Sequence, residues 1–157
     1  AKAAMDAAVA AGAEKYATAE FNAAKTLWVA TEAQMTEKKY EEAKKGYVST
    51  KAAFEKAAAA AAIGKKAMTD EVSAAMVALE EGWKNLEATA KSIEKKMKEK
   101  KDELAADTKS FMEGVKATKD MIANDPAGAK AKAGELKALI DKWDAAFKEM
   151  DTAPAKK

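Results

Sequence analysis

The chain has 157 residues, and its 28 basic side chains against 26 acidic ones give a formal net charge of +2. It contains no Cys, no His and no Arg, and Ala is its commonest residue. Metal sites and covalent catalysis most often use Cys and His, and bidentate phosphate binding uses Arg. The composition therefore argues against a metal, haem or disulfide protein, and the nearly balanced charge argues against a dedicated nucleic-acid binder.

Helix signals dominate the sequence. Sustained apolar–polar alternation and Asn-Gly or Asp-Gly hairpin turns are both missing. Because Ala buries little area, a core must rely on scattered Trp, Phe, Leu, Ile and Met side chains. We expect one all-α domain over residues 1–157, an elongated antiparallel bundle of helical hairpins with one long central helix. No apolar run is long enough for a membrane span.

The first expected elements are a short Ala-rich helix over residues 2–11, ended by Gly12, and a helix that begins near Thr18. Thr is a good N-cap residue, and a negative charge in the first turn, from Glu20, suits the helix dipole. The basic pair Lys38 and Lys39 suits its C-terminal end. Its apolar stripe has spacings of three and four and comprises Phe21, Ala24, Trp28, Thr31 and Met35.

A second helix is expected over residues 40–63, with Gly64 as the left-handed residue that ends it. Together with the helix before it, it would form an antiparallel hairpin over residues 10–67. Its stripe comprises Tyr40, Ala43, Tyr47, Thr50, Phe54, Ala57 and Ala61.

The clearest apolar seam follows, after a cap at Thr69 or Asp70. We expect one long helix over residues 69–123, although Lys100 and Asp107 fall on core positions. A break near residues 106–108 is the alternative. The seam repeats at three and four residues and comprises Val72, Met76, Leu79, Trp83, Leu86, Ala90, Ile93 and Met97.

Asp125 and Pro126 predict the start of the last helix, as N-cap and first helical residue. This helix is expected over residues 126–150 and is followed by a frayed tail over 151–157. Short connections make successive helices antiparallel. The hairpin should therefore cover the seam from Val72 to Met97, and the last helix should fold back on 104–122. The last stripe comprises Ala133, Leu136, Ile140, Trp143, Phe147 and Met150.

Two stretches carry a family resemblance, AGAEKYATAEF at residues 11–21 and KKYEEAKKGY at 38–47. They resemble the DUF4398-type helical domain of bacterial cell-envelope lipoproteins, a hairpin similar to a tetratricopeptide unit. Thr18 stands where that family often has Pro, and its lipid-bearing Cys is not in this sequence. The resemblance covers about a third of the chain. It implies a periplasmic or outer-membrane-tethered location, a scaffolding or binding role and no catalytic residues, and it leaves open a lipid anchor on the precursor.

The residues offer little chemistry of their own. Adjacent acids such as Glu80 and Glu81 point to different helix faces and form no dyad. Ser92 and Lys95 match a Ser-x-x-Lys spacing but lie within a Lys/Glu-rich helical stretch, so we interpret the match as chance. We therefore predict no catalytic, cofactor-binding or metal-ligating residues and no cofactor. The tryptophans are interpreted as core anchors and the methionines as gap fillers.

These observations predict a non-enzymatic scaffold or spacer protein of the bacterial cell envelope, bound to envelope proteins that the sequence does not identify. The alternative is an amphipathic lipid or small apolar ligand binder whose helices open to expose apolar faces such as that of Trp143, Phe147 and Met150. Self-association is a third possibility, in which a partner helix would supply counter-charges at Lys100 and Asp107.

Overall fold

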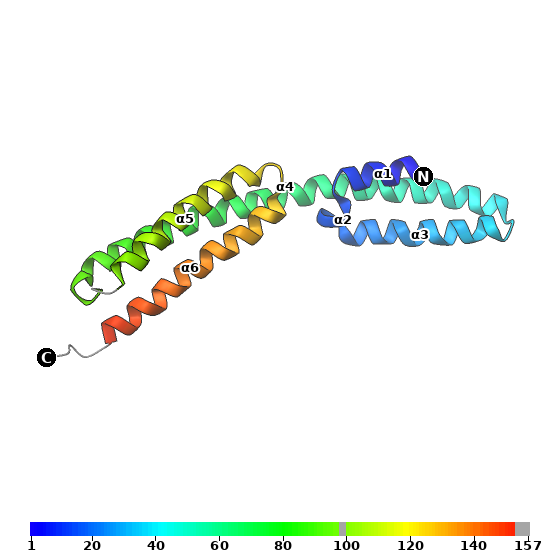
Figure 1. The fold of residues 1–157 in the computed structure, drawn as a ribbon. Coiled ribbons are helices and arrows are strands. Elements are labelled where there is room, and N and C mark those ends of the chain that lie inside the picture. The colour runs from blue at the N-terminus through cyan, green and yellow to red at the C-terminus, as the bar shows by residue number, and fades with distance from the viewer. Residues whose placement is uncertain (98–99, 153–157) are drawn as a thin grey trace. The chain divides into compact units, whose positions relative to one another are not determined.

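The computed structural model describes residues 1–97 and 100–152, and all regular structure in these residues is helical. This confirms the all-α class and the presence of one long helix. Where we expected one domain, the contacts divide the chain into two compact units, residues 1–67 and 68–157. The elements in Figure 1 are α1 (Lys2–Ala10), α2 (Ala13–Tyr16), α3 (Thr18–Thr36), α4 (Tyr40–Ser92), the 3₁₀ helix η1 (Glu94–Lys96), α5 (Lys101–Ile122) and α6 (Pro126–Thr152).

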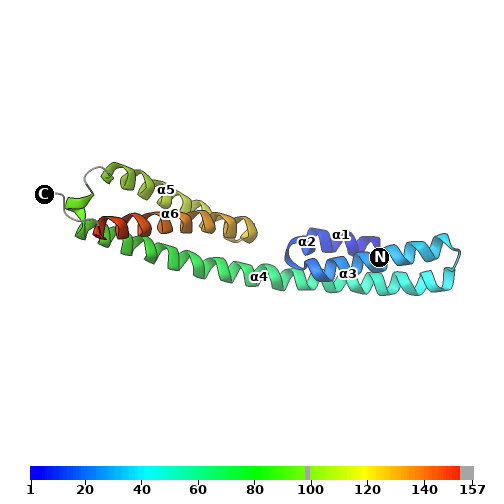
Figure 2. The same cartoon turned by 90° about the horizontal axis from the view of Figure 1, so that it is seen from below.

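In unit 1, α1, α3 and the first part of α4 lie side by side (Figures 1 and 2). The predicted antiparallel hairpin is present, because Phe21 meets Phe54 edge to face at 5.6 Å and Trp28 meets Tyr47 at 6.0 Å. The rest of this core is Ala, which lets the helices approach closely. Its other buried members are Ala8, Ala13, Ala17, Ala24, Ala57 and Ala61.

Two residues at the ends of the predicted apolar stripes are exposed and not buried, so the prediction is wrong for them. Met35 and Tyr40, which lie next to the turn between α3 and α4, are 40% and 59% exposed. Thr18 is not an N-cap either. Its hydroxyl donates to the Glu14 carbonyl oxygen at 2.9 Å, since the unpredicted helix α2 ends just before it.

The turn after α3 is closed by a left-handed residue that is not glycine. Lys38 has φ +60°. Its N–H donates to the Met35 carbonyl at 3.1 Å, and the Lys39 N–H donates to the Gln34 carbonyl at 2.9 Å. This is the Schellman pattern, in which glycine is the usual residue at the left-handed position.

We therefore expect Lys38→Gly to stabilise the protein. Glycine adopts positive φ without the Cβ clash, so the free energy of unfolding should rise by about 0.5–1 kcal/mol. Urea unfolding followed by circular dichroism measures the change, and Lys39→Gly is the matched control that should destabilise. A decrease in stability for Lys38→Gly would contradict the assignment of strain to this residue.

The expected helix end at Gly64 is wrong, because α4 continues through it to Ser92. The flanking residues, Ala57–Ala62 and Lys65–Ala67, are good helix formers. Gly64 serves packing instead: a Cβ added there would overlap the Tyr16 carbonyl oxygen and lie 3.1 Å from its carbonyl carbon. A glycine that looks like a helix stop in the sequence is thus a close-approach residue in the fold.

Unit 2 is an up-down-up bundle of the second part of α4, α5 and α6, which run alongside one another in both views (Figures 1 and 2). Trp83 of α4 stacks on Phe111 of α5, with ring centroids 4.3 Å apart and planes 13° apart. The predicted seam is buried, but α5 and α6 cover it, not the hairpin of unit 1. The buried cluster comprises Val72, Met76, Leu79, Trp83, Leu86, Ala90, Met97, Phe111, Val115, Ala129, Ala133, Leu136, Trp143 and Phe147.

The predicted continuous helix over 69–123 is wrong, and so is the alternative break at 106–108. The chain leaves α4 after Ser92 and begins α5 at Lys101. Ile93 has φ −105° and ψ 19°, and Lys100 has φ −107° and ψ 1°, outside the helical region. The reversal is favourable because it brings Phe111 onto Trp83, so that the seam finds its partner within the chain.

The start of the last helix is confirmed. The Gly128 N–H donates to Asp125 Oδ1 at 3.1 Å, which makes Asp125 the N-cap, and Pro126 is the first helical residue. As predicted, α6 packs along α5. It extends two residues beyond the expected end, so that Asp151 and Thr152 of the predicted tail are helical. The remainder of that tail, residues 153–157, lies outside the described residues.

Candidate functional site

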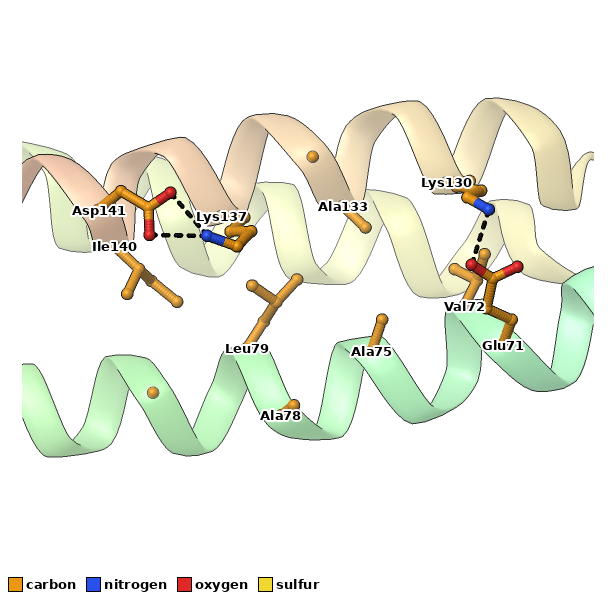
Figure 3. Close-up of a pocket in the computed structure, with 12 residues that line it drawn as sticks. Glu71, Val72, Ala75, Ala78, Leu79, Lys130, Ala133, Lys137, Ile140 and Asp141 are labelled. Carbon is orange, nitrogen blue, oxygen red and sulfur yellow. Dashed lines mark hydrogen bonds and ion pairs between the residues drawn. The ribbon is translucent and has the colours of Figure 1, made fainter.

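A groove of about 430 Å³ lies between α4 and α6 within unit 2 (Figure 3). Its floor is apolar, with Val72 and Leu79 buried at the base. α4 and α6 run parallel here, since Lys130 pairs with Glu71 at one end and Ile140 lies against Gly82 towards the other. The groove is lined by Glu71, Val72, Ala75, Ala78, Leu79 and Gly82 of α4 and by Lys130, Ala133, Gly134, Lys137, Ile140 and Asp141 of α6.

Small residues create the groove. A Cβ on Gly82 would lie 3.2 Å from Ile140 Cδ1, so Gly82 has a packing role within the chain. A Cβ on Gly134 would meet nothing within 4 Å. Glycine in a helix interior costs about 1 kcal/mol relative to Ala, and no contact among the described residues of this chain accounts for that cost at Gly134.

Ion pairs border the groove. Lys130 Nζ lies 2.6 Å from Glu71 Oε1. Lys137 Nζ lies 2.8 and 2.7 Å from the two carboxylate oxygens of Asp141, one turn further along α6 (Figure 3). All four side chains are more than half exposed, so each pair adds little to stability. An apolar floor with polar sides suits a contact surface or an apolar ligand.

A second cavity, of about 700 Å³, lies between α4 and α5 beside the stacked Trp83 and Phe111. Lys119 forms an ion pair across it with Glu80. The Trp83 indole N–H is buried and finds no hydrogen-bond acceptor in the described part of the chain. Trp83 is 1% exposed and stacked, which makes it a core anchor, as predicted.

Asp107, which the sequence places on a core position, receives its counter-charge from α6 of the same chain. Its Oδ2 accepts hydrogen bonds from Lys142 Nζ at 2.7 Å and from Trp143 Nε1 at 2.9 Å. Lys142 also pairs with Glu103 at 2.6 Å. The Lys142 ammonium, followed by the Trp143 N–H, holds the pKa of Asp107 below its ordinary value despite partial burial. The counter-charge that we assigned to a partner helix is therefore intramolecular here.

The other residues that the sequence singled out lie in helical segments or in the core. Ser92 Oγ donates to the Thr89 carbonyl at 2.7 Å, and Lys95 lies in η1. The face proposed for lipid binding is part of the core, since Trp143 is 0% and Phe147 4% exposed. Sequence reasoning missed the groove. The available signal was Gly134, a glycine in the middle of an otherwise regular helical pattern.

Within residues 1–97 and 100–152, no group of three or more Asp and Glu side chains gathers as a metal site. The same residues contain no helix that is both long enough and apolar enough to cross a membrane.

The fold and the groove define an all-α protein of two helical units, with an apolar groove between parallel helices of the second unit. No family model, curated protein or solved structure matches the chain. The resemblance to the DUF4398-type domain therefore stays a prediction from residues 11–21 and 38–47.

Proposed function

We propose that this protein is a non-enzymatic interaction protein that binds a protein partner through the α4–α6 groove of unit 2. The observation that carries the proposal is the groove itself, an open and largely apolar surface between two helices of the three-helix bundle. Gly134 supports it, because an unfilled space above a helical glycine allows another backbone to approach closely.

The wider role we propose is that of a scaffold or spacer in the bacterial cell envelope. Its location in the periplasm or at the outer membrane depends on the sequence resemblance alone. Two polar side chains support a non-enzymatic role. The Ser92 hydroxyl donates a hydrogen bond to the helix backbone, and the Asp107 carboxylate holds Lys142 of α6 in a structural ion pair.

Site-specific photo-cross-linking tests this function in the cells that naturally make the protein. A benzophenone amino acid replaces Ala78, which lines the groove, or Ala88, an exposed residue on the same helix outside it. We expect adducts with a protein from position 78 and none from position 88. Equal labelling from both positions, or no adduct from position 78, would overturn the proposal.

A small apolar ligand is the second candidate occupant, because the groove volume of about 430 Å³ and its apolar floor are typical of ligand pockets. Calorimetric titration with dodecanoate tests it. Saturable binding that is lost in Ala78→Trp and kept in Ala88→Trp would favour this candidate. Binding that is absent, or unchanged in Ala78→Trp, would eliminate it.

A further inference from the structure

We propose that a second copy of this chain covers the α4–α6 groove, packed antiparallel across a two-fold axis so that the two grooves face each other. The inference rests on the proposed function, since it names the partner for the same groove. A two-fold contact requires a surface that is complementary to itself.

The α6 side of the groove has that property. Lys130, Gly134, Lys137 and Asp141 follow one another at spacings of four, three and four, so they form one stripe along the helix. All four are exposed. When a second stripe lies antiparallel on the first, Lys130 faces the partner's Asp141 and Gly134 faces the partner's Lys137.

The steric pattern agrees with this pairing. The missing side chain of Gly134 leaves space above the helix, since a Cβ there meets nothing within 4 Å. The apolar stem of a lysine can lie along such a surface while its ammonium stays in water. The pairing thus places the stem of the partner's Lys137 over Gly134 and accounts for a glycine that no contact within the described chain explains.

The α4 side shares the same axis. Lys130 pairs with Glu71, and Ile140 lies against Gly82, which fixes the register of α4 beside α6. The point on α4 level with the midpoint of the α6 stripe falls between Ala75 and Ala78. These two small residues face each other across the axis, so that the α4 helices also meet without a bulky side chain between them.

The charges balance at each end of the contact. One copy contributes Glu71 and Lys130, and the other contributes the partner's Lys137 and the partner's Asp141. Two acids and two lysines therefore gather at each end, and the pairs within each chain are kept and shared. Apart from Val72 and Leu79 at the floor of the groove, the apolar seam of unit 2 takes no part, since it is buried in the chain's own core.

The contact is small. It extends from Lys130 to Asp141, about 16 Å of helix at a rise of about 1.5 Å per residue. Small interfaces are typical of weak complexes, so we expect a dissociation constant on the order of micromolar. Ionic strength should weaken the dimer because the end charges are exposed.

Sedimentation equilibrium from about 1 to 500 µM is suited to such an affinity. We expect the mass of the full chain to rise from 16.7 kDa towards twice that value as concentration increases. Gly134→Trp should stay monomeric with an unchanged helical spectrum, because its Cβ enters open space, and Ala88→Trp should dimerise like the parent. A parent chain that is monomeric throughout, or a Gly134→Trp variant that still dimerises, would overturn the inference.

Exchange of the end charges tests the antiparallel pairing. Lys130→Asp alone and Asp141→Lys alone each place like charges together at both ends, so each should be monomeric. A mixture of the two should form a heterodimer, because Asp at position 130 of one chain then faces Lys at position 141 of the other. A mixture that stays monomeric, or single variants that dimerise as well as the parent, would contradict this register.

The same cross-linker placed at Lys137, which lines the groove and faces the open space above the partner's Gly134, separates this inference from the proposed function. A self-adduct of the purified chain supports the second copy as partner. An adduct with a different protein, from a chain that sediments as a monomer, would overturn the inference and leave the proposed function standing.

Discussion

Gly64→Ala is expected to lower the free energy of unfolding by about 2–3 kcal/mol, although Ala is the better helix former. Gly64 lies within α4, where intrinsic propensity alone would predict stabilisation by about 1 kcal/mol. The opposite sign is expected because the new Cβ would overlap the Tyr16 carbonyl oxygen. Backbone atoms cannot rotate away as the end of a flexible side chain can, so α2 and α4 would have to separate.

Urea unfolding measures the loss, and hydrogen exchange locates it in the helices of unit 1. Gly134→Ala is the matched control, measured at a concentration where the chain is monomeric. It is also a helical glycine, but its Cβ meets nothing, so this substitution should stabilise by about 0.5–1 kcal/mol. If both substitutions stabilised the protein, the close approach of Tyr16 to α4 would be disproved.

The second large effect is expected at Asp107 in unit 2. Asp107→Ala should lower the free energy of unfolding by about 2–3 kcal/mol, because it removes a charge-assisted hydrogen bond from Lys142 and leaves the buried Trp143 N–H without its acceptor. Asp107→Asn should lose about 1 kcal/mol, since its amide oxygen can still accept from Trp143. Asp102→Ala, at an exposed position of the same helix, is the control and should be close to neutral.

The pH dependence of this effect has a definite sign. Because the pKa of Asp107 is lowered in the folded protein, the unfolded chain takes up the proton first as the solution becomes acidic. The stabilisation is therefore complete above the unfolded pKa, near 4, and declines as the pH falls through the lower folded value. Urea unfolding of the parent and Asp107→Asn from pH 7 to pH 2 should show a difference that is constant above about pH 5 and shrinks below pH 4.

A stability difference that persisted unchanged to pH 2 would show that the carboxylate charge is not the source. A Lys142→Met variant separates the two hydrogen bonds, because it keeps the acceptor for Trp143 and removes the ammonium. It should lose most of the pH dependence below pH 4 while retaining part of the stability that Asp107→Ala loses.

Apolar periodicity was enough to predict the all-α class and most of the buried helix faces. The seam from Val72 to Met97 is buried apart from a partly exposed Ile93, and the cap at Asp125 is present. The connections were harder to predict. Periodicity reports which face is apolar but not which helix covers it, so the seam was assigned to the wrong partner.

The errors at Gly64 and at residues 93–100 have a common physical origin. Glycine is equally suited to a helix end and to a close approach between backbones, and only the position of Tyr16 distinguishes the two. At residues 93–100 no Pro or Gly marks the end of the helix. The chain turns back between α4 and α5 because Phe111 of α5 packs on Trp83 of α4. The local sequence carries no signal of such a tertiary contact.

The groove could not be predicted from the sequence for a related reason. Ala is common throughout this chain, so Ala75 and Ala78 were indistinguishable from other alanines, and Gly134 could not be assigned to a groove until the register of α4 and α6 was known. The face of Trp143 and Phe147, which we expected to bind lipid once the helices open, is buried in the core of this structure, as bulky apolar residues usually are.

The continuity of α4 has a consequence for dissecting the molecule. Both units take part of their core from this helix, and the division between Ala67 and Met68 falls within it. Between Tyr40 and Ser92 the chain offers no loop for a protease to nick, and a truncation at residue 67 would cut a helix in mid-course. Fragments of this protein should therefore keep an overlapping stretch of α4, so that each half retains a folded end.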